Sequence, residues 1–303
     1  MKKLTTKFLT LSLSAFSLVM AVIYGDFDAI EIEDIEVDQI DWQAKAKSVA
    51  VYLSEEDLEP VGNGYYRLNI AYTLQKEYPK LKKHPFLEQP AFGISTAFLV
   101  ADDKLMTVGH ADKNRLLKVV YIFDYEWDVK NKKLKKEIYH ESEIYRCTKI
   151  LTSKNNKRKG DYAVLLMDKK IKGKTPLKVR NINRKSLIGK DIVTIGSPDG
   201  VPLKFTKKGV VWEKLPYDGL SENKFFIHNL DVSVGSSGSP IFLKSTGEVI
   251  GIQSRGEDDY IETDTEMVFV QGDYDGKNSN LGRSLVGECG SLIPQKVINI
   301  INK

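Results

Sequence analysis

The sequence has few of the side chains that bind metals or form disulfides. Its 303 residues include two cysteines, Cys147 and Cys289, and four histidines. The histidines show no His-Glu-x-x-His pattern and no ligand spacing, so we expect no metal site and no metal cofactor. Two cysteines allow one disulfide, and the sequence leaves their pairing open because it gives no distance between them. P-loop and dinucleotide fingerprints are also lacking, so no cofactor of any kind is expected.

Long apolar runs are missing except near the N-terminus. Three lysines among the first seven residues precede an uncharged apolar run from Phe8 to about Tyr24. This order is typical of a secretory signal peptide, assigned here to residues 1–25. Small residues at 19–21 offer one cleavage site, and a cut after Gly25 is the alternative. The run is slightly short for a membrane span, and an uncleaved anchor is the other alternative. We expect a secreted or periplasmic protein with no stable membrane insertion after signal cleavage.

The charge distribution argues against a nucleic-acid partner. The net charge is +4, and lysines concentrate at 130–136 and 154–159. We interpret both runs as solvated loops, because no aromatic residues alternate with the bases of the second run. By contrast, residues 26–41 contain eight acids and no base. We interpret 26–44 as a flexible acidic leader; a pro-segment lying on the basic body and an edge strand are the alternatives.

The rest of the chain is rich in short β-prone runs separated by turn signals. Many short strands with regular turns are typical of barrels or sandwiches rather than a parallel α/β sheet, so the sequence predicts an all-β fold. A helix is expected after Pro294, with apolar residues at helical spacing, and a weaker one at 75–83. We predict strands at 49–53, 93–100, 105–108, 117–123, 144–151, 162–167, 191–195, 210–212, 225–230, 241–243 and 249–253.

The segment 234–240, with the sequence Val-Gly-Ser-Ser-Gly-Ser-Pro, is the most distinctive candidate site. Glycines flanking Ser237 let backbone amides point at a reacting atom, and a serine held there can act as a nucleophile. Such a serine needs an imidazole to accept its proton and a carboxylate to orient the imidazole. His110 follows one predicted strand and Asp161 begins another. An α/β-hydrolase is excluded because its histidine would come last in the chain.

These segments resemble the chymotrypsin-fold serine endopeptidases of the bacterial trypsin-like type, and within them the glutamyl endopeptidases. The likeness extends from about residue 48 to 290, with weaker matches at 195–198 and 251–256. It implies two perpendicular six-stranded antiparallel β-barrels, roughly 45–180 and 181–303, with the active site between them and the final helix packed on the body. The specific motifs are Thr-Ala-Phe-Leu-Val leading to Thr-Val-Gly-His, Gly-Asp-Tyr-Ala-Val-Leu and Gly-Ser-Ser-Gly-Ser-Pro.

The resemblance also assigns roles to individual residues. It makes His110 the general base and then the general acid, Asp161 the residue that orients it, and Ser237 the nucleophile. The N–H groups of Gly235 and Ser237 would form the oxyanion hole. Ser254 matches a serine that hydrogen-bonds the triad aspartate. The strand that holds the substrate backbone would contain Gln253, Ser254, Arg255 and Gly256.

Several positions depart from the family pattern. The cysteines that flank the catalytic histidine in many relatives are replaced by Ala111 and Ile94, and no trypsin-type activation site is present. Glutamyl-specific relatives have a histidine where Gln253 stands and a threonine where Val232 stands, so a glutamate preference is not supported. Asp231 stands where trypsin has its specificity acid, which would favour lysine or arginine in the substrate. Non-tryptic bacterial relatives also carry an acid there.

The sequence therefore predicts a secreted serine endopeptidase that hydrolyses protein or peptide substrates through an acyl-enzyme intermediate. The alternative is a catalytically inactive binding or scaffold protein that keeps the barrels.

Overall fold

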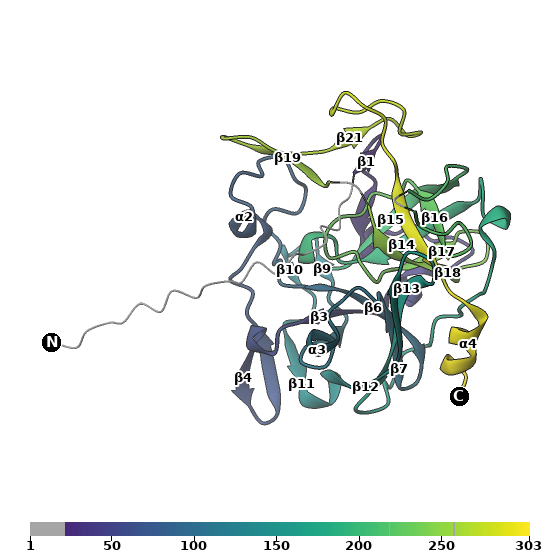
Figure 1. Cartoon of the computed structure of the whole chain (residues 1–303). Helices are drawn as coiled ribbons and strands as arrows, with labels where there is room; N and C mark the ends of the chain where they lie inside the picture. The colour runs from purple at the N-terminus through teal and green to yellow at the C-terminus, as the bar shows by residue number, and fades with distance from the viewer. Residues whose placement is uncertain (1–21, 218, 257) are drawn as a thin grey trace.

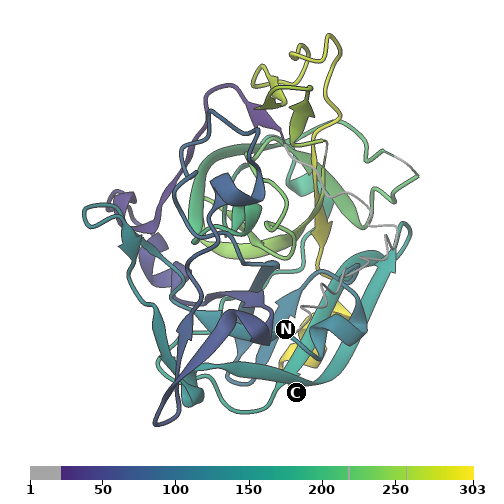
Figure 2. The same ribbon diagram turned by 90° about the vertical axis from the view of Figure 1, so that its left-hand side faces the viewer.

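The computed structural model describes residues 22–217, 219–256 and 258–303, and its strands form two β-barrels. Figure 1 shows the first barrel as an open ring in the lower half of the molecule. Figure 2, turned by 90°, shows the second barrel as a green ring. The predicted all-β fold, with two six-stranded antiparallel barrels and a C-terminal helix, is confirmed.

The first barrel is closed by six antiparallel strands, most of which bury both faces. On β3, Val49, Val51 and Leu53 join one apolar cluster while Ala50 and Tyr52 join another, which contains residues of all six strands. In the order in which they pair, the strands are β12 (Tyr145–Asn156), β13 (Gly160–Met167), β7 (Lys104–Thr107), β6 (Ser95–Ala101), β3 (Val49–Leu53) and β8 (Val120–Phe123).

The second barrel is a ring of six antiparallel strands that closes where β14 pairs with β15. The ring of Phe226 packs against Gly251 of β18 and Gly290 of β22. A Cβ would lie 2.6 Å from this ring at Gly251 and 2.3 Å from it at Gly290, so the ring occupies the space that side chains there would need. In pairing order the strands are β14 (Asp191–Gly196), β17 (Pro240–Leu243), β18 (Glu248–Arg255), β22 (Glu288–Leu292), β16 (Phe225–His228) and β15 (Lys204–Trp212).

Residues 22–46 pack against the second barrel. Strand β2 (Ala29–Glu31) pairs with β15, and Glu31 Oε2 lies 3.0 Å from Nζ of the buried Lys204. Trp42 begins helix α1 (Trp42–Ala46) and is 2% exposed, with its ring against Phe205 and Phe242. The interpretation as a flexible leader is therefore wrong for the buried parts of this segment, and the edge-strand alternative describes Ala29–Glu31. Whether the segment acts as a pro-segment stays a prediction.

The helices are few and short. Helix α4 (Gln295–Ile301) packs Val297 and Ile301 into the large core cluster that also contains residues of both barrels. Helix α2 (Leu74–Glu77) is shorter than the predicted 75–83, because Pro79 disfavours a helical conformation at Tyr78, whose φ is −121°. The other helices of the described residues are α3 (Lys113–Leu116) and the 3₁₀ turns η1 (Ile32–Asp34), η2 (Glu55–Asp57), η3 (Glu141–Glu143), η4 (Arg184–Ser186) and η5 (Pro198–Gly200).

The described residues also form smaller sheets outside the two barrels. They comprise β1 (Ile23–Tyr24) with β21 (Gln271–Gly272), β9 (Trp127–Asp128) with β10 (Lys133–Leu134), β19 (Tyr260–Glu262) with β20 (Met267–Phe269), and the set β11 (Ile138–His140), β5 (Tyr65–Leu68) and β4 (Leu58–Gly62).

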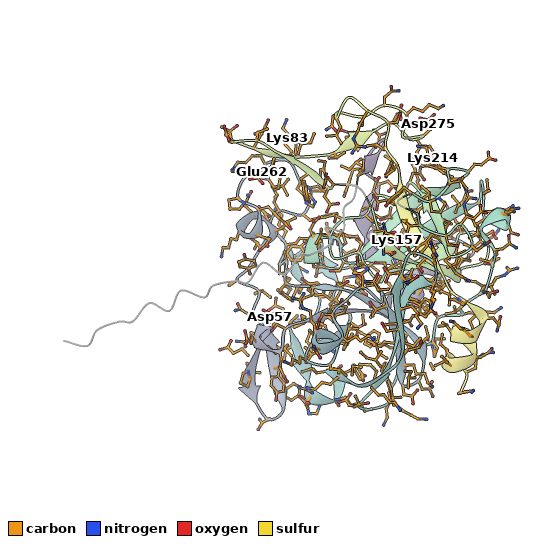
Figure 3. All side chains as sticks on the ribbon, viewed as in Figure 1. Asp57, Lys83, Lys157, Lys214, Glu262 and Asp275 are labelled. Atoms are coloured by element: carbon orange, nitrogen blue, oxygen red, sulfur yellow. The ribbon has the colours of Figure 1, made fainter. Side chains whose placement is uncertain are left out.

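The lysine-rich run at 154–159, predicted as a loop, lies at the turn of the β12–β13 hairpin. Strand β12 continues to Asn156, and Lys154 pairs with Tyr162. Lys157 is exposed at this turn, and its side chain is labelled in Figure 3. Within the described ranges, no helix has both the length and the apolar character needed to cross a membrane.

Both cysteines are buried free thiols. Cys147 lies on β12 of the first barrel and Cys289 on β22 of the second. Burial raises the pKa of Cys147 to about 11 and also raises the pKa of Cys289 above its ordinary value. The disulfide that the sequence left open is not formed.

Candidate active site

Strand pairing brings His110 and Asp161 together. Strand β13 runs antiparallel to β7, with Ala163 opposite Thr107. Asp161 precedes Ala163 by two residues and His110 follows Thr107 by three. The register therefore sets the carboxylate beside the segment that leaves β7.

Gly109 permits the close approach of these segments. A Cβ there would lie 1.8 Å from the carbonyl oxygen of Lys154 and 2.6 Å from that of Tyr162, so any side chain would force the backbones apart. In this position the N–H groups of Gly109 and His110 each donate to Asp161 Oδ1 at 2.8 Å. The backbone thus fixes one carboxylate oxygen.

The second carboxylate oxygen faces the imidazole. Asp161 Oδ2 lies 2.6 Å from His110 Nδ1 and accepts a hydrogen bond of 2.6 Å from Ser254 Oγ. Arg255 Nη2 lies 3.7 Å from the same oxygen. Burial alone would raise the pKa of Asp161, but the hydrogen bonds from His110 and Ser254 and the charge of Arg255 hold that pKa below its ordinary value. The carboxylate is therefore ionised at neutral pH and suited to orient an imidazole.

The turn that carries Ser237 is tied to the first barrel by its backbone. Ser237 O accepts hydrogen bonds from Ser95 Oγ at 2.5 Å and from Thr96 N–H at 3.0 Å. Gly238, with φ +88°, fits there because a Cβ would lie 2.0 Å from the oxygen of Thr96. That oxygen also accepts from Thr107 Oγ1 at 2.7 Å. Two hydrogen-bonded steps therefore join the serine turn to the strand that precedes the histidine.

The Ser237 hydroxyl is buried, and within the described part of the chain its oxygen has no hydrogen-bond partner, His110 included. The structure thus joins His110 to Asp161 directly and connects Ser237 to them through the backbone. Catalytic hydrogen bonds are often long in a site without substrate and shorten in the complex. The complete triad stays a prediction.

Two backbone N–H groups of the serine turn are free, those of Gly235 and Ser237. Among the hydrogen bonds of the described residues, neither group donates. The other N–H groups of the segment each donate one bond, at residues 233, 234, 236, 238 and 239. These free donors are the pair that the resemblance assigned to an oxyanion hole, and they are suited to hold a developing negative charge.

The predicted substrate strand lies between the two halves of this site. Gln253 O accepts from Gly238 N–H at 2.9 Å, and its side chain donates to Glu288 at 3.1 Å. Ser254 and Arg255 turn toward Asp161, as described above. Gly256 follows the end of β18 and is partly exposed. The Gln253 side chain is thus buried and hydrogen-bonded, whereas the Arg255 side chain is 26% exposed.

Asp231 is used differently from a specificity acid. Its carboxylate accepts hydrogen bonds from the N–H groups of Tyr24 at 2.8 Å and Asp28 at 3.1 Å, and it is 6% exposed. Burial, followed by the charge of Asp28, raises its pKa well above the ordinary value. These contacts hold the N-terminal segment, which favours a structural role. A role in substrate choice stays a prediction.

Sequence reasoning missed several residues that shape the site. Ser95 was assigned only to a strand, and Thr96 to a strand and a family motif without a role of its own, although both bind the backbone of the serine turn. Asp199 and Asp259 also contact that turn, from loops distant in sequence. The weak match at 195–198 and the turn signal at 197–200 lie at or beside Asp199, whereas no local pattern marks Asp259.

Comparisons with known proteins define the class of this molecule. A family model described as the trypsin-like peptidase domain matches residues 95–252, just over half of the chain, and this range includes His110, Asp161 and Ser237. The chain belongs to the trypsin-like peptidase family. No curated protein matches it in sequence.

Solved structures add information on the fold. A Glu endopeptidase in complex with MPD shares 13% identity at a TM-score of 0.50, covering 93% of this chain and 98% of its own. The Ser343Ala mutant of Rv3671c from M. tuberculosis, in an inactive form, shares 16% identity at a TM-score of 0.43, with coverages of 84% and 85%. The first of these likenesses shows a common chymotrypsin-type fold.

Proposed function

We propose that this peptidase is a serine endopeptidase in which Ser237, His110 and Asp161 form the catalytic triad. The observation that supports it most strongly is the paired arrangement of a buried, ionised Asp161 on His110 and two free N–H groups beside Ser237. A carboxylate, an imidazole, a hydroxyl and two free donors are the parts that acyl transfer requires.

The reaction follows from these positions. His110 accepts the hydroxyl proton while Ser237 Oγ bonds to the carbonyl carbon of the substrate. The negative charge on the carbonyl oxygen is held by the N–H groups of Gly235 and Ser237. His110 then gives the proton to the leaving amine as the C–N bond breaks, leaving an acyl-enzyme. A water molecule, activated by His110, releases the acid product and frees Ser237.

Labelling with a fluorophosphonate probe tests the nucleophile. We expect the wild type to be labelled and Ser237→Ala to remain unlabelled. Absence of labelling in folded wild-type protein would overturn the proposal and favour the inactive binding protein. The unpartnered Ser237 hydroxyl is the observation behind that second candidate.

A diverse peptide pool, with cleavage positions read by mass spectrometry, tests endopeptidase activity and shows which residue precedes the cut. Internal cleavage by the wild type and none by Ser237→Ala is expected. Proteins and peptides are thus the proposed substrates.

We also propose that the protein is exported, with its signal removed after Ala21. Val22–Tyr24 are buried, and Tyr24 N–H donates a hydrogen bond to Asp231, so these residues belong to the folded protein. The predicted signal residues 1–21 lie outside the described residues. A cut after Gly25 would remove the contact between Tyr24 and Asp231. Sequencing the N-terminus of exported protein distinguishes the two sites, and recovery of all the protein in the cytoplasm would contradict export.

A further inference from the structure

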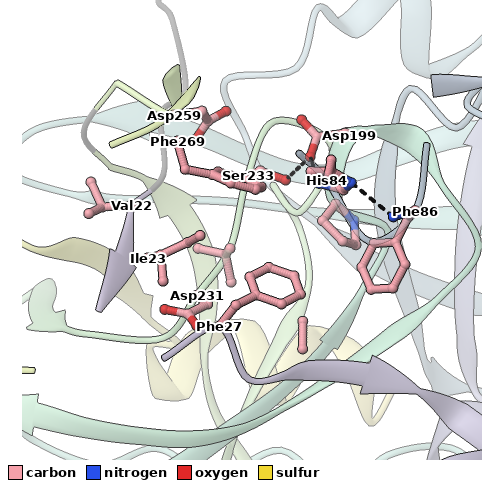
Figure 4. A pocket seen from close by; sticks show the side chains of 13 residues that line it. Val22, Ile23, Phe27, His84, Phe86, Asp199, Asp231, Ser233, Asp259 and Phe269 are labelled. Carbon is pink, nitrogen blue, oxygen red and sulfur yellow. Dashed lines mark hydrogen bonds and ion pairs between the residues drawn. The ribbon is translucent and has the colours of Figure 1, made fainter. Parts of the chain in front are cut away.

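A group of buried carboxyls lies directly behind the serine turn. They line a small cavity of about 20 Å³ together with apolar residues of the N-terminal segment and of β20. Figure 4 shows Asp199 and Asp259 on either side of Ser233, with His84 next to Asp199. Asp199 lies in the turn η5, and Asp259 lies in the loop between β18 and β19.

These two acids hold the residues that immediately precede Gly235. Asp199 Oδ2 accepts a hydrogen bond from Ser233 Oγ at 2.7 Å, and its backbone N–H donates to Val234 O. Asp259 Oδ2 accepts from Val234 N–H at 3.0 Å. Three hydrogen bonds from two separate loops therefore fix the backbone of residues 233–234.

The fixed peptide determines where the next N–H group points. In a trans peptide the C=O and the following N–H point in opposite directions. Because Val234 O is directed at Asp199 N–H, Gly235 N–H is directed away from Asp199 and toward no other partner in the described chain. Gly235, with φ +94°, also packs so closely that a Cβ would lie 2.4 Å from the oxygen of Ser197.

Among the described residues, no lysine or arginine lies within ion-pair distance of either carboxyl group. The basic group beside Asp199 is His84, whose Nε2 lies 3.7 Å from Asp199 Oδ2. Burial lowers the pKa of His84 to about 3, so this ring is neutral. Burial raises the pKa of Asp199 to about 6, and burial with the charge of Asp199 raises that of Asp259 well above its ordinary value.

Two buried acids without a cation cost stability, since desolvation of a carboxyl is unfavourable. Both acids contact the turn on which the proposed catalysis depends. We infer that Asp199 and Asp259 are positioning residues for the oxyanion hole, which hold the Val234–Gly235 peptide in its orientation. This inference rests on the proposed function, because an oxyanion hole matters only if Ser237 attacks a carbonyl.

A comparison of Asp259→Leu with Asp259→Asn tests the inference. Asparagine keeps an oxygen that accepts from Val234 N–H and resembles the protonated acid, whereas leucine of similar size does not. Loss of an oxyanion donor costs about 10²–10³ in rate, so we expect about a 10–100-fold lower kcat for Asp259→Leu when the donor is displaced rather than removed. KM should change less than about threefold, and Asp259→Asn should keep most of the wild-type kcat.

The phosphonylation rate with a fluorophosphonate provides a readout that needs no knowledge of the substrate. It should fall in parallel with kcat, because the phosphoryl oxygen occupies the same hole. The neighbouring Asp258 is exposed, so Asp258→Leu is the matched control and should react at the wild-type rate. If Asp259→Leu does not fold, Ser233→Ala decides instead, since it removes only the hydrogen bond to Asp199, and its kcat should fall by about 3–10-fold.

The outcomes separate the two proposals. Unlabelled wild type would overturn the proposed function. If the wild type is labelled, two results would overturn the positioning role. One is a folded Asp259→Leu that reacts as fast as the wild type, and the other is an Asp259→Leu whose KM rises while its kcat is unchanged. If only Ser233→Ala can be measured, a wild-type kcat in that variant would also overturn the positioning role.

Discussion

Replacement of Asp161 by asparagine perturbs the proposed triad without changing its shape. Four donors converge on this carboxylate: two backbone N–H groups at Oδ1, each at 2.8 Å, and His110 Nδ1 and Ser254 Oγ at Oδ2, each at 2.6 Å. The backbone donors cannot turn away. The asparagine must therefore place its oxygen toward them and its NH₂ group toward His110.

This orientation forces the imidazole into the wrong tautomer. The NH₂ group only donates, so His110 Nδ1 must accept, and the ring proton moves to Nε2. The nitrogen that should take the proton of Ser237 is then occupied. We expect kcat to fall by about 10⁴, equivalent to about 5.5 kcal/mol in activation free energy. The Ser254 hydroxyl can rotate and accept from the new amide, so the fold should be retained.

The assay combines the phosphonylation rate, kcat on a peptide identified from the pool, and thermal unfolding. Asp168→Asn is a matched control, because Asp168 is an exposed acid just beyond the other end of β13 and should leave both rates unchanged. A folded Asp161→Asn protein with more than about a tenth of the wild-type kcat would refute the tautomer argument.

Three further predictions concern the surroundings of the site. Glu31→Ala should lower the free energy of unfolding by about 3–5 kcal/mol, because it leaves the buried Lys204 ammonium unpaired. The pKa of Lys204 is lowered to about 8 by burial, so in urea unfolding this loss should be smaller at pH 9 than at pH 6; an equal loss at both would contradict the assignment. Asp231→Ser should leave the cleavage positions of the peptide pool unchanged and lower the melting temperature, whereas an altered residue before the cut would restore Asp231 as a specificity acid. Cys147 and Cys289 should resist iodoacetamide in the folded protein, and a reductant should not change the melting temperature; rapid alkylation would show that the thiols are accessible.

Much of the fold can be predicted from the sequence because its pattern is local. The predicted strands at 49–53, 93–100 and 105–108 correspond to β3, β6 and β7, in which alternate residues belong to different apolar clusters. Strands made mainly of polar residues show no such apolar pattern in the sequence. Strand β12 continues to Asn156 because its backbone pairs with β13, and this pairing does not need apolar side chains.

The N-terminal segment was misread because its partner lies far along the chain. Eight acids without a base are typical of a solvated segment, but Glu31 pairs with Lys204, and the backbone of β2 adds to the edge at β15. A buried ion pair between residues so distant in sequence has no local pattern. The same reason explains why Asp259 escaped notice, whereas the residues of the proposed triad each lie in a recognisable motif.

The segment 231–234 leads directly into the serine turn, and buried acids hold both of its ends. Asp231 binds the backbone at Tyr24 and Asp28, while Asp199 and Asp259 bind residues 233 and 234. A lost contact at residue 231 loosens the N-terminal segment, and a lost contact at 233–234 reorients the peptide before Gly235. Variants at the first end should therefore lower stability more than catalysis, and variants at the second end should do the reverse. The two sets of contacts hold one short backbone segment. A double variant of Asp231 and Asp259 should therefore lower the free energy of unfolding, measured in urea, by more than the sum of the two single decreases.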